Sequence, residues 1–148
     1  MNKDIKSENS DGAGCIFCKI VKGEIPCAKV YEDEDILAFL DVAPVNIGHS
    51  LVIPKKHFAD IHETPDKIMG EMMKVAKKIS SAIKSGVGAD GINVYMNNDK
   101  AAFQAVFHAH VHVIPRFFND GLPEFHSKRS YKEGEQKEVA KKIISAIP

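Results

Sequence analysis

Histidines alternate strictly with apolar residues in one short stretch of this chain, and no other feature constrains the fold as much. Successive side chains of a β-strand point to opposite faces, so His108, His110 and His112 are expected on one face, with alanine and valine on the other. We predict a strand over Ala105–Ile114 that ends at Pro115. Its apolar face is expected to join the core, and its histidine face to form an active site.

Further strands and two longer helices are expected around this one. Short runs rich in β-branched and aromatic residues predict strands at Lys29–Tyr31, Ile36–Leu40, Ser50–Ile53 and Ile92–Met96. A long helix is expected to start with Thr64 as N-cap and Pro65 at its first position, and to end at Gly86. Ile16–Val21 predicts a short helical turn, and an amphipathic helix is expected over Val139–Ile147. Strands in succession with few helices between them predict an α+β domain on an antiparallel sheet.

Length and charge bound the class of protein. The 148 residues predict one domain over 15–148, preceded by a polar, flexible leader over 1–14. Basic and acidic residues number 20 each, which argues against a nucleic-acid polymer or an anionic membrane as partner. No apolar run approaches the roughly 20 residues of a membrane span. Three cysteines do not make a disulfide framework, so a cytoplasmic protein is expected.

The three histidines favour chemistry on a phosphate over binding of a single metal ion. Neighbouring side chains on one face of a strand stand roughly 6–7 Å apart and the outer pair about 13 Å, which is wide for three ligands of one ion. One neutral imidazole can attack while another donates a proton at the same pH, because the ordinary pKa is about 6.5. A metal hydrolase with three histidine ligands stays open as an alternative, as do histidines that are merely exposed.

The segment His108–Ile114 resembles the signature of the histidine triad (HIT) superfamily. Phe39-Leu-Asp41, Pro44 and the block Gly48–His57 resemble the upstream part of the same pattern. The resemblance covers Cys15–Arg116 and is to the Hint-type branch and its bacterial and archaeal relatives. It implies a HIT-like fold, with an antiparallel meander sheet, one long central helix and a C-terminal helix. It also implies a homodimer with a continuous sheet.

The resemblance implies a nucleotide hydrolase or transferase that cleaves at the α-phosphate of a purine nucleotide conjugate. By position, His110 attacks the phosphate and forms a nucleotidyl-histidine intermediate. His112 would stabilise the developing charge, and His49 would orient the other two histidines. The expected substrates are nucleoside phosphoramidates, adenylated amines or dinucleoside polyphosphates.

Contacts to the rest of the substrate are implied in the same way. Asp41 would accept hydrogen bonds from the ribose hydroxyls, because a carboxylate offers two acceptor oxygens. Asn97 and Gln104 would bond to the phosphate or to a neighbouring histidine, and His108 is assigned to this group as well. The base is expected among the apolar side chains Phe17, Ile20 and Leu40.

Two residues depart from the pattern. Hint-type relatives commonly carry Gly-Gln-Ser where this chain has Phe103-Gln104-Ala105. Ala105 lacks a hydroxyl that could assist a leaving group, and Phe103 places a bulky ring beside the phosphates. These departures keep a second class of function open, a nucleotide-binding regulatory protein with weak turnover.

Cys15-Ile-Phe-Cys18 is a CxxC motif with two interpretations. A redox role is typical of a thioredoxin-like βαβ context, which this sequence does not predict. In HIT relatives that open with this motif, the positions of four residues here form a structural zinc site: Cys15, Cys18, His57 and His108. Two thiolates and two imidazoles suit tetrahedral zinc. In that case His108 would not be free to act on a substrate.

Overall fold

The computed structural model describes residues 12–122 and 129–148. The chain divides into two compact units, Met1–Phe118 and Asn119–Pro148, and each is described by itself. Of the leader predicted over 1–14, residues 1–11 lie outside the described part, and the single domain over 15–148 stays a prediction. Among the described residues, no helix is both long and apolar enough to cross a membrane.

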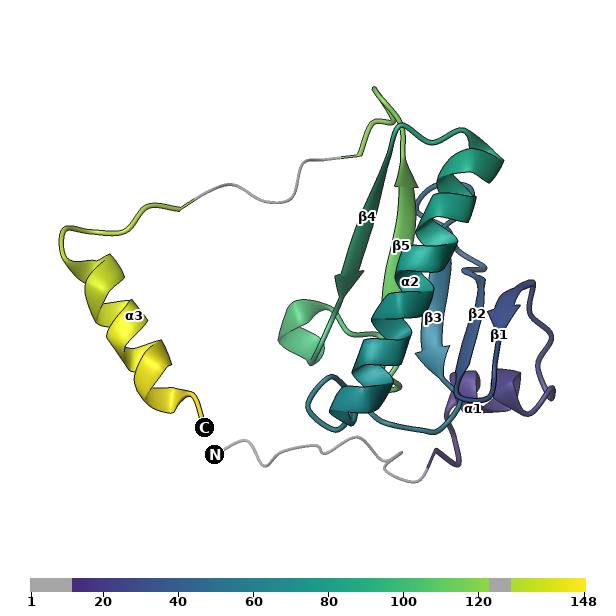
Figure 1. Ribbon diagram of the computed structural model, residues 1–148, viewed down its shortest axis with the longest axis horizontal. Coiled ribbons are helices and arrows are strands. Elements are labelled where there is room, and N and C mark those ends of the chain that lie inside the picture. The colour runs from purple at the N-terminus through teal and green to yellow at the C-terminus, as the bar shows by residue number, and fades with distance from the viewer. Residues whose placement is uncertain (1–11, 123–128) are drawn as a thin grey trace. The chain divides into compact units, whose positions relative to one another are not determined.

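The first unit is built on a five-stranded sheet with the order β1-β2-β3-β5-β4, in which all neighbouring strands are antiparallel (Figure 1). The strands are β1 Lys29–Glu32, β2 Ile36–Leu40, β3 Ser50–Pro54, β4 Gly91–Met96 and β5 Val111–Arg116. The first three strands form a meander. A long helix then links β3 to β4 at the sheet edge, and β5 returns between these two strands. The predicted α+β class with an antiparallel sheet is confirmed.

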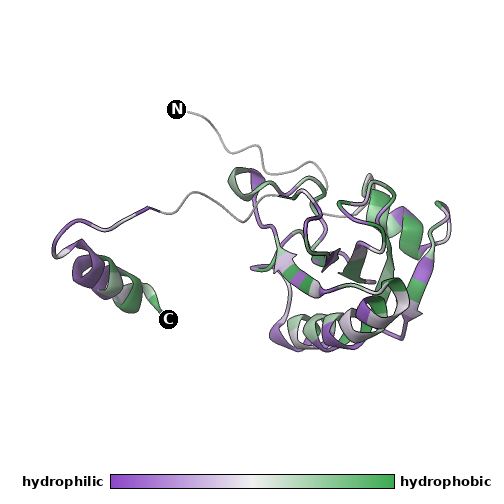
Figure 2. Ribbon diagram, turned by 90° about the horizontal axis from the view of Figure 1, so that it is seen from above, coloured by the Kyte–Doolittle hydropathy of each residue, from purple (hydrophilic) through white to green (hydrophobic). Residues whose placement is uncertain are grey.

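The long helix, α2 (Asp66–Val87), packs across one face of the sheet (Figures 1 and 2). Its apolar positions recur every three or four residues, so a single stripe faces the sheet while the other side carries polar residues. This stripe and the facing strand residues form the larger core, which includes Met72, Val75, Ile79, Ile83, Ile36, Val52 and Val111. The methionine at the centre of the stripe is fully buried, as expected for a core residue.

The ends of α2 differ from the predicted caps. Pro65 is the N-cap, and its carbonyl accepts the first helical bond from the N–H of Met69. The hydroxyl of Thr64 instead donates to the carbonyl of Asp60 at 2.6 Å, so it is used in the preceding turn. At the other end the helix continues beyond Gly86 and stops where Gly88 adopts a left-handed conformation (φ +67°). A left-handed C-cap is the position where glycine is least strained.

A short helix, α1 (Ile16–Val21), packs against the opposite face of the sheet and confirms the predicted helical turn. Its buried residues join a second core of side chains from β2 and β3, made up of Cys15, Phe17, Cys18, Leu37, Phe39, Leu51 and Ile53. The sheet therefore has two covered faces at this end. In the second unit, α3 (Glu135–Ala146) confirms a C-terminal helix, which starts before the predicted Val139.

The histidine-rich strand is shorter than predicted. β5 begins at Val111, because the N–H of Ala109 donates to the carbonyl of Phe58 at 2.7 Å, in a loop outside the sheet. At its other end β5 continues to Arg116, one residue beyond Pro115, where the strand was predicted to stop. Pro115 lies inside the strand and is paired with Ile92 of β4. The ladder with β3 ends at Val113, so proline stands where no donor to β3 is needed. Of the three histidines, only His112 lies in the assigned strand.

Candidate functional site

The side chains from His108 to Val113 alternate between the two faces of the backbone, although the strand itself begins only at Val111. Ala109, Val111 and Val113 are all buried in the core beneath α2. The intervening histidines therefore lie on the opposite side of the backbone, as the period of two predicts. Across the ladder, Tyr95 is paired with His112, and the two rings stack with centroids 4.7 Å apart and an interplanar angle of 19°. Sequence reasoning missed this tyrosine, because its place beside His112 depends on strand register.

His49 and His112 form a hydrogen-bonded pair at this face, and the Asp41 carboxylate lies close to it. The N–H of Val45 donates to Nδ1 of His49 at 3.1 Å, which requires that nitrogen to be unprotonated. A neutral His49 then carries its proton on Nε2, which lies 2.9 Å from Nδ1 of His112 and 3.7 Å from Oδ2 of Asp41. His49 thus donates to His112, and the free proton of His112 is on its own Nε2. The two histidines are thus hydrogen-bonded to each other, and the orienting role that the resemblance implies for His49 stays a prediction.

His110 lies next to this pair, with its ring centroid 4.9 Å from that of His112. Its Nδ1 is 2.7 Å from the backbone oxygen of His108, and a carbonyl oxygen can only accept a hydrogen bond. The proton of neutral His110 is therefore on Nδ1, and Nε2 keeps its lone pair. This is the tautomer that a nucleophile attacking through Nε2 requires.

Burial keeps these three imidazoles neutral. It lowers the pKa of His110, an effect that the hydrogen bond to the His108 carbonyl and the Asp41 charge partly offset. Burial, together with the neighbouring His110 and His49, lowers the pKa of His112 to about 4. Burial likewise lowers the pKa of His49 despite the nearby Asp41. At neutral pH, Nε2 of His110 therefore carries a lone pair and Nε2 of His112 carries a proton, and neither atom is used in a hydrogen bond among the described residues.

These shifts predict how activity depends on pH. Because the folded-state pKa of His110 lies below its ordinary value of about 6.5, the lone pair on Nε2 persists at pH values where an exposed histidine is already protonated. The value of kcat/KM is therefore expected to stay level as the pH falls through 6.5 and to decline only below it. A pH profile with a nucleotide anhydride as substrate checks this. An acid limb centred at or above pH 6.5 would contradict it.

Gln104 and Asn97 lie in the segment between β4 and β5. The buried Gln104 amide accepts from the N–H of Asp99 at 2.9 Å and donates to the carbonyls of Ala59 and Val106 at 2.6 and 3.0 Å. A direct bond from Gln104 to a substrate would therefore break one of these contacts. The Asn97 amide makes a longer contact, 3.5 Å, to the carbonyl of Phe103. The substrate roles of both residues stay predictions.

Phe103 stands in a backbone conformation that favours glycine. Its φ is +65°, and its side chain is 82% exposed. This conformation costs an ordinary side chain roughly 1–2 kcal/mol. The Gly-Gln-Ser segment that the resemblance implies would place glycine in this turn, where it is less strained.

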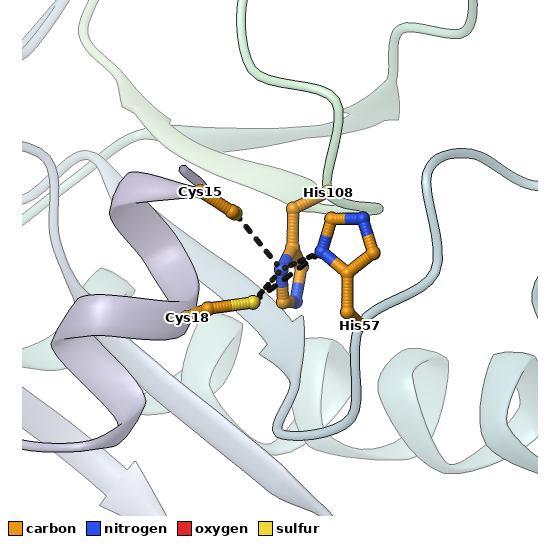
Figure 3. Close-up of side chains that lie close together, drawn as sticks. All are labelled: Cys15, Cys18, His57 and His108. Carbon is orange, nitrogen blue, oxygen red and sulfur yellow. Dashed lines mark hydrogen bonds between the residues drawn. The ribbon is translucent and has the colours of Figure 1, made fainter. Parts of the chain in front are cut away.

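A second cluster brings together the CxxC motif and two histidines from distant parts of the chain (Figure 3). One ring atom or sulfur from each of Cys15, Cys18, His57 and His108 lies within 4.8 Å of all the others. The Nδ1 of His108 is 3.4 and 3.5 Å from the two sulfurs and 3.2 Å from Nδ1 of His57, which is 3.3 Å from the Cys18 sulfur. Bond lengths of about 2.0 Å to nitrogen and 2.3 Å to sulfur give ligand separations of roughly 3.3–3.8 Å in a tetrahedron. The donors fit a tetrahedral metal ion.

The protonation of His108 also suits a ligand. Its Nε2 is 2.8 Å from the carbonyl oxygen of Pro54, so the proton is on Nε2 and the lone pair on Nδ1 faces the cluster. Burial lowers the pKa of His108 to about 4, and burial raises the pKa of Cys18 to about 11. A cation would supply the charge that a buried thiolate needs. Both ring nitrogens of His108 have partners, and the side chain is fully buried. The position therefore suits a metal ligand better than a residue that contacts the substrate.

These geometries weaken the alternative of three histidines on one catalytic metal. The Nδ1 of His108 faces the cysteines, whereas that of His110 donates to a backbone carbonyl. The other group within ligand distance among the described residues is the one formed by Asp41, His49 and His112, and it has a proton on His49 Nε2, the atom that would have to bind the metal. The four-residue Cys/His cluster is the better metal site.

Comparisons with known proteins agree with the geometry. The family model for the HIT domain matches residues 22–119. The chain is 42% identical over 133 residues to an adenylylsulfatase of Arabidopsis thaliana, covering 90% of this chain and 67% of that protein. It is 49% identical over 102 residues to an adenosine 5′-monophosphoramidase of Schizosaccharomyces pombe, covering 69% and 74%.

A solved structure extends the likeness to a protein that binds zinc. A zinc-bound histidine triad family protein from Mycobacterium smegmatis matches with a TM-score of 0.72 and 40% identity, covering 90% of this chain and 98% of that one. Its match confirms the predicted HIT-like fold. Together with the family model and the two hydrolases, it shows that the chain belongs to the HIT domain family of nucleotide hydrolases.

Proposed function

We propose that this protein hydrolyses a purine nucleotide conjugate at its α-phosphate, with His110 as the nucleophile. The observation that carries the proposal is the hydrogen bond from His110 Nδ1 to the His108 carbonyl, which leaves the lone pair on Nε2. In the first step this nitrogen forms a bond to phosphorus, and the bond between phosphorus and the leaving group breaks. Water then attacks the same phosphorus, releases AMP and restores neutral His110.

The neighbouring residues have roles that follow from their hydrogen bonds. His112 accepts from His49 and so keeps a proton on Nε2, which can donate to a phosphate oxygen as charge develops. Asp41 uses one oxygen to accept from the N–H of Ala43, and its second oxygen is available for the ribose hydroxyls. Asn97 is proposed to contact the phosphate. Gln104 is proposed to hold the loop that carries it.

The proposed cofactor is zinc in the Cys/His cluster, where it would bind Cys15, Cys18, His57 and His108. The donor set and the donor separations support this choice, since two thiolates and two imidazoles in a closed tetrahedron are typical of structural zinc. The ion would fix α1 against the sheet. The cysteine thiolates that it needs persist in a reducing compartment, which supports a cytoplasmic location.

We also propose a homodimer. β4 is an edge strand of the sheet. Two apolar side chains near it are exposed: Val94 on β4 at 40% and Met73 on α2 at 47%. An edge with apolar neighbours can pair with its own copy about a twofold axis and extend the sheet.

The substrate class is tested with a panel of AMP conjugates: an amide, an anhydride with an inorganic acid and a dinucleoside polyphosphate. Release of AMP from at least one member is expected. Anhydrides should turn over faster than amides, because the Ala105 position offers no hydroxyl to help protonate a departing amine. Ala105→Ser, at an exposed position, should raise the amide rate relative to the anhydride rate. Tight binding of AMP without turnover of any member would instead favour the regulatory alternative.

A further inference from the structure

Phe17 lies inside the CxxC motif, and its ring contacts the nucleophile of the proposed reaction. The side chain is 7% exposed. Its ring centroid is 5.2 Å from that of His110, and the two rings are nearly perpendicular, at 86°. The same ring lies edge-on to His108 at 5.9 Å and to Phe39 at 5.6 Å. The residue expected beside the base is therefore packed against the histidines.

The hydrogen bond to the His108 carbonyl fixes His110 at Nδ1 only. A ring fixed at one atom can still tilt about that bond, and tilting moves Nε2, the atom that must meet the phosphorus. A second ring packed perpendicular to the imidazole opposes this tilt, and such edge-to-face pairs are a favoured arrangement of aromatic rings. Phe17 thus supplies the restraint that the hydrogen bond lacks.

The position of Phe17 is set in turn by the Cys/His cluster. Cys15 and Cys18 flank it and point to His108 and His57. The cluster is consequently connected to His110 through the backbone oxygen of His108 and through the ring of Phe17.

We propose that Phe17 is a positioning residue that fixes the plane of the His110 imidazole and connects it to the metal cluster. This inference rests on the proposed function, because it assumes that His110 attacks the substrate. It assigns to the CxxC segment a part in the rate of the first chemical step, beyond its part in stability.

Phe17→Leu, compared with Phe39→Leu, tests the proposal. Both replace a buried phenylalanine of the same core, but Phe39 contacts Phe17 and not the nucleophile in the described contacts. For metal-loaded Phe17→Leu we expect the rate of adenylyl transfer to the protein at saturating substrate to fall at least about tenfold with metal content unchanged, whatever happens to KM, because the same side chain is also expected beside the base. Phe39→Leu is expected to keep this rate. A higher KM with an unchanged rate, or no change at all, would overturn the proposal.

A measurement on the wild-type protein covers the case in which Phe17→Leu does not fold. Nuclear Overhauser contacts between the rings of Phe17 and His110 are expected in the metal-loaded protein and should persist when AMP binds. Contacts from Phe17 to the base protons of AMP, with loss of those to His110, would refute the positioning role. If wild-type protein forms no adenylated histidine at all, the proposed function fails. If it forms one at an equal rate in Phe17→Leu, only this inference fails.

Discussion

Replacing His110 with asparagine is expected to lower kcat by at least about 10⁴-fold while AMP still binds. The amide N–H of asparagine can take the place of Nδ1–H and donate to the His108 carbonyl, so the local hydrogen bond is kept. What the variant lacks is the second nitrogen with its free lone pair. A rate measured with a nucleotide anhydride, together with AMP binding by calorimetry, separates the lost chemistry from lost binding.

His62→Asn is the matched control for this variant. His62 is exposed and lies in the turn before α2, so the same substitution there should leave kcat and AMP binding unchanged. If His110→Asn kept even one tenth of the wild-type rate, attack by His110 could not be the main route of hydrolysis.

Loss of the proposed zinc ion is expected to have the largest effect on stability. Cys18→Ser should abolish tight binding of one zinc ion per chain and lower the free energy of unfolding by several kcal/mol, on the order of 3–5. The physical reason is that the remaining donors, on Cys15, His57 and His108, would then face one another without a cation. Metal analysis and thermal unfolding with and without a chelator measure both effects.

Cys27→Ser is the control for that prediction, because Cys27 is only partly buried at the margin of the second core. It should keep the metal and most of the stability. Equal stability of Cys18→Ser and wild type, with metal bound in neither, would argue against a structural metal ion in this protein.

Much of the fold could be predicted because its pattern is local. The alternation around His110 fixed the face on which the histidines lie, and the spacing of apolar residues in α2 predicted a helix against the sheet. The strand ends and caps were less predictable. The start of β5 depends on a hydrogen bond from Ala109 to a loop 51 positions earlier in the numbering, and no local signal reports such a contact.

The resemblance predicted which of the candidate site residues lie close together, and it predicted their individual contacts less well. The resemblance named His49, His112 and Asp41, and the structure places all three together. Which ring nitrogen of a histidine carries the proton depends on its backbone partners, such as the His108 carbonyl. Every residue has such a carbonyl, so the sequence does not show which one a histidine contacts. The stacking of Tyr95 on His112 follows from strand register in the same way.

Covalent adenylation of His110 is the step on which the proposed function depends, and trapping the adenylated protein measures it directly. Wild-type protein mixed with an AMP anhydride and quenched in base after a few milliseconds is expected to carry one AMP on His110, located by mass spectrometry of the peptide. The label should disappear as AMP is released and should be absent from His110→Asn. Rapid release of AMP with no label on His110 at any time, or a label on another residue, would show that His110 is not the nucleophile.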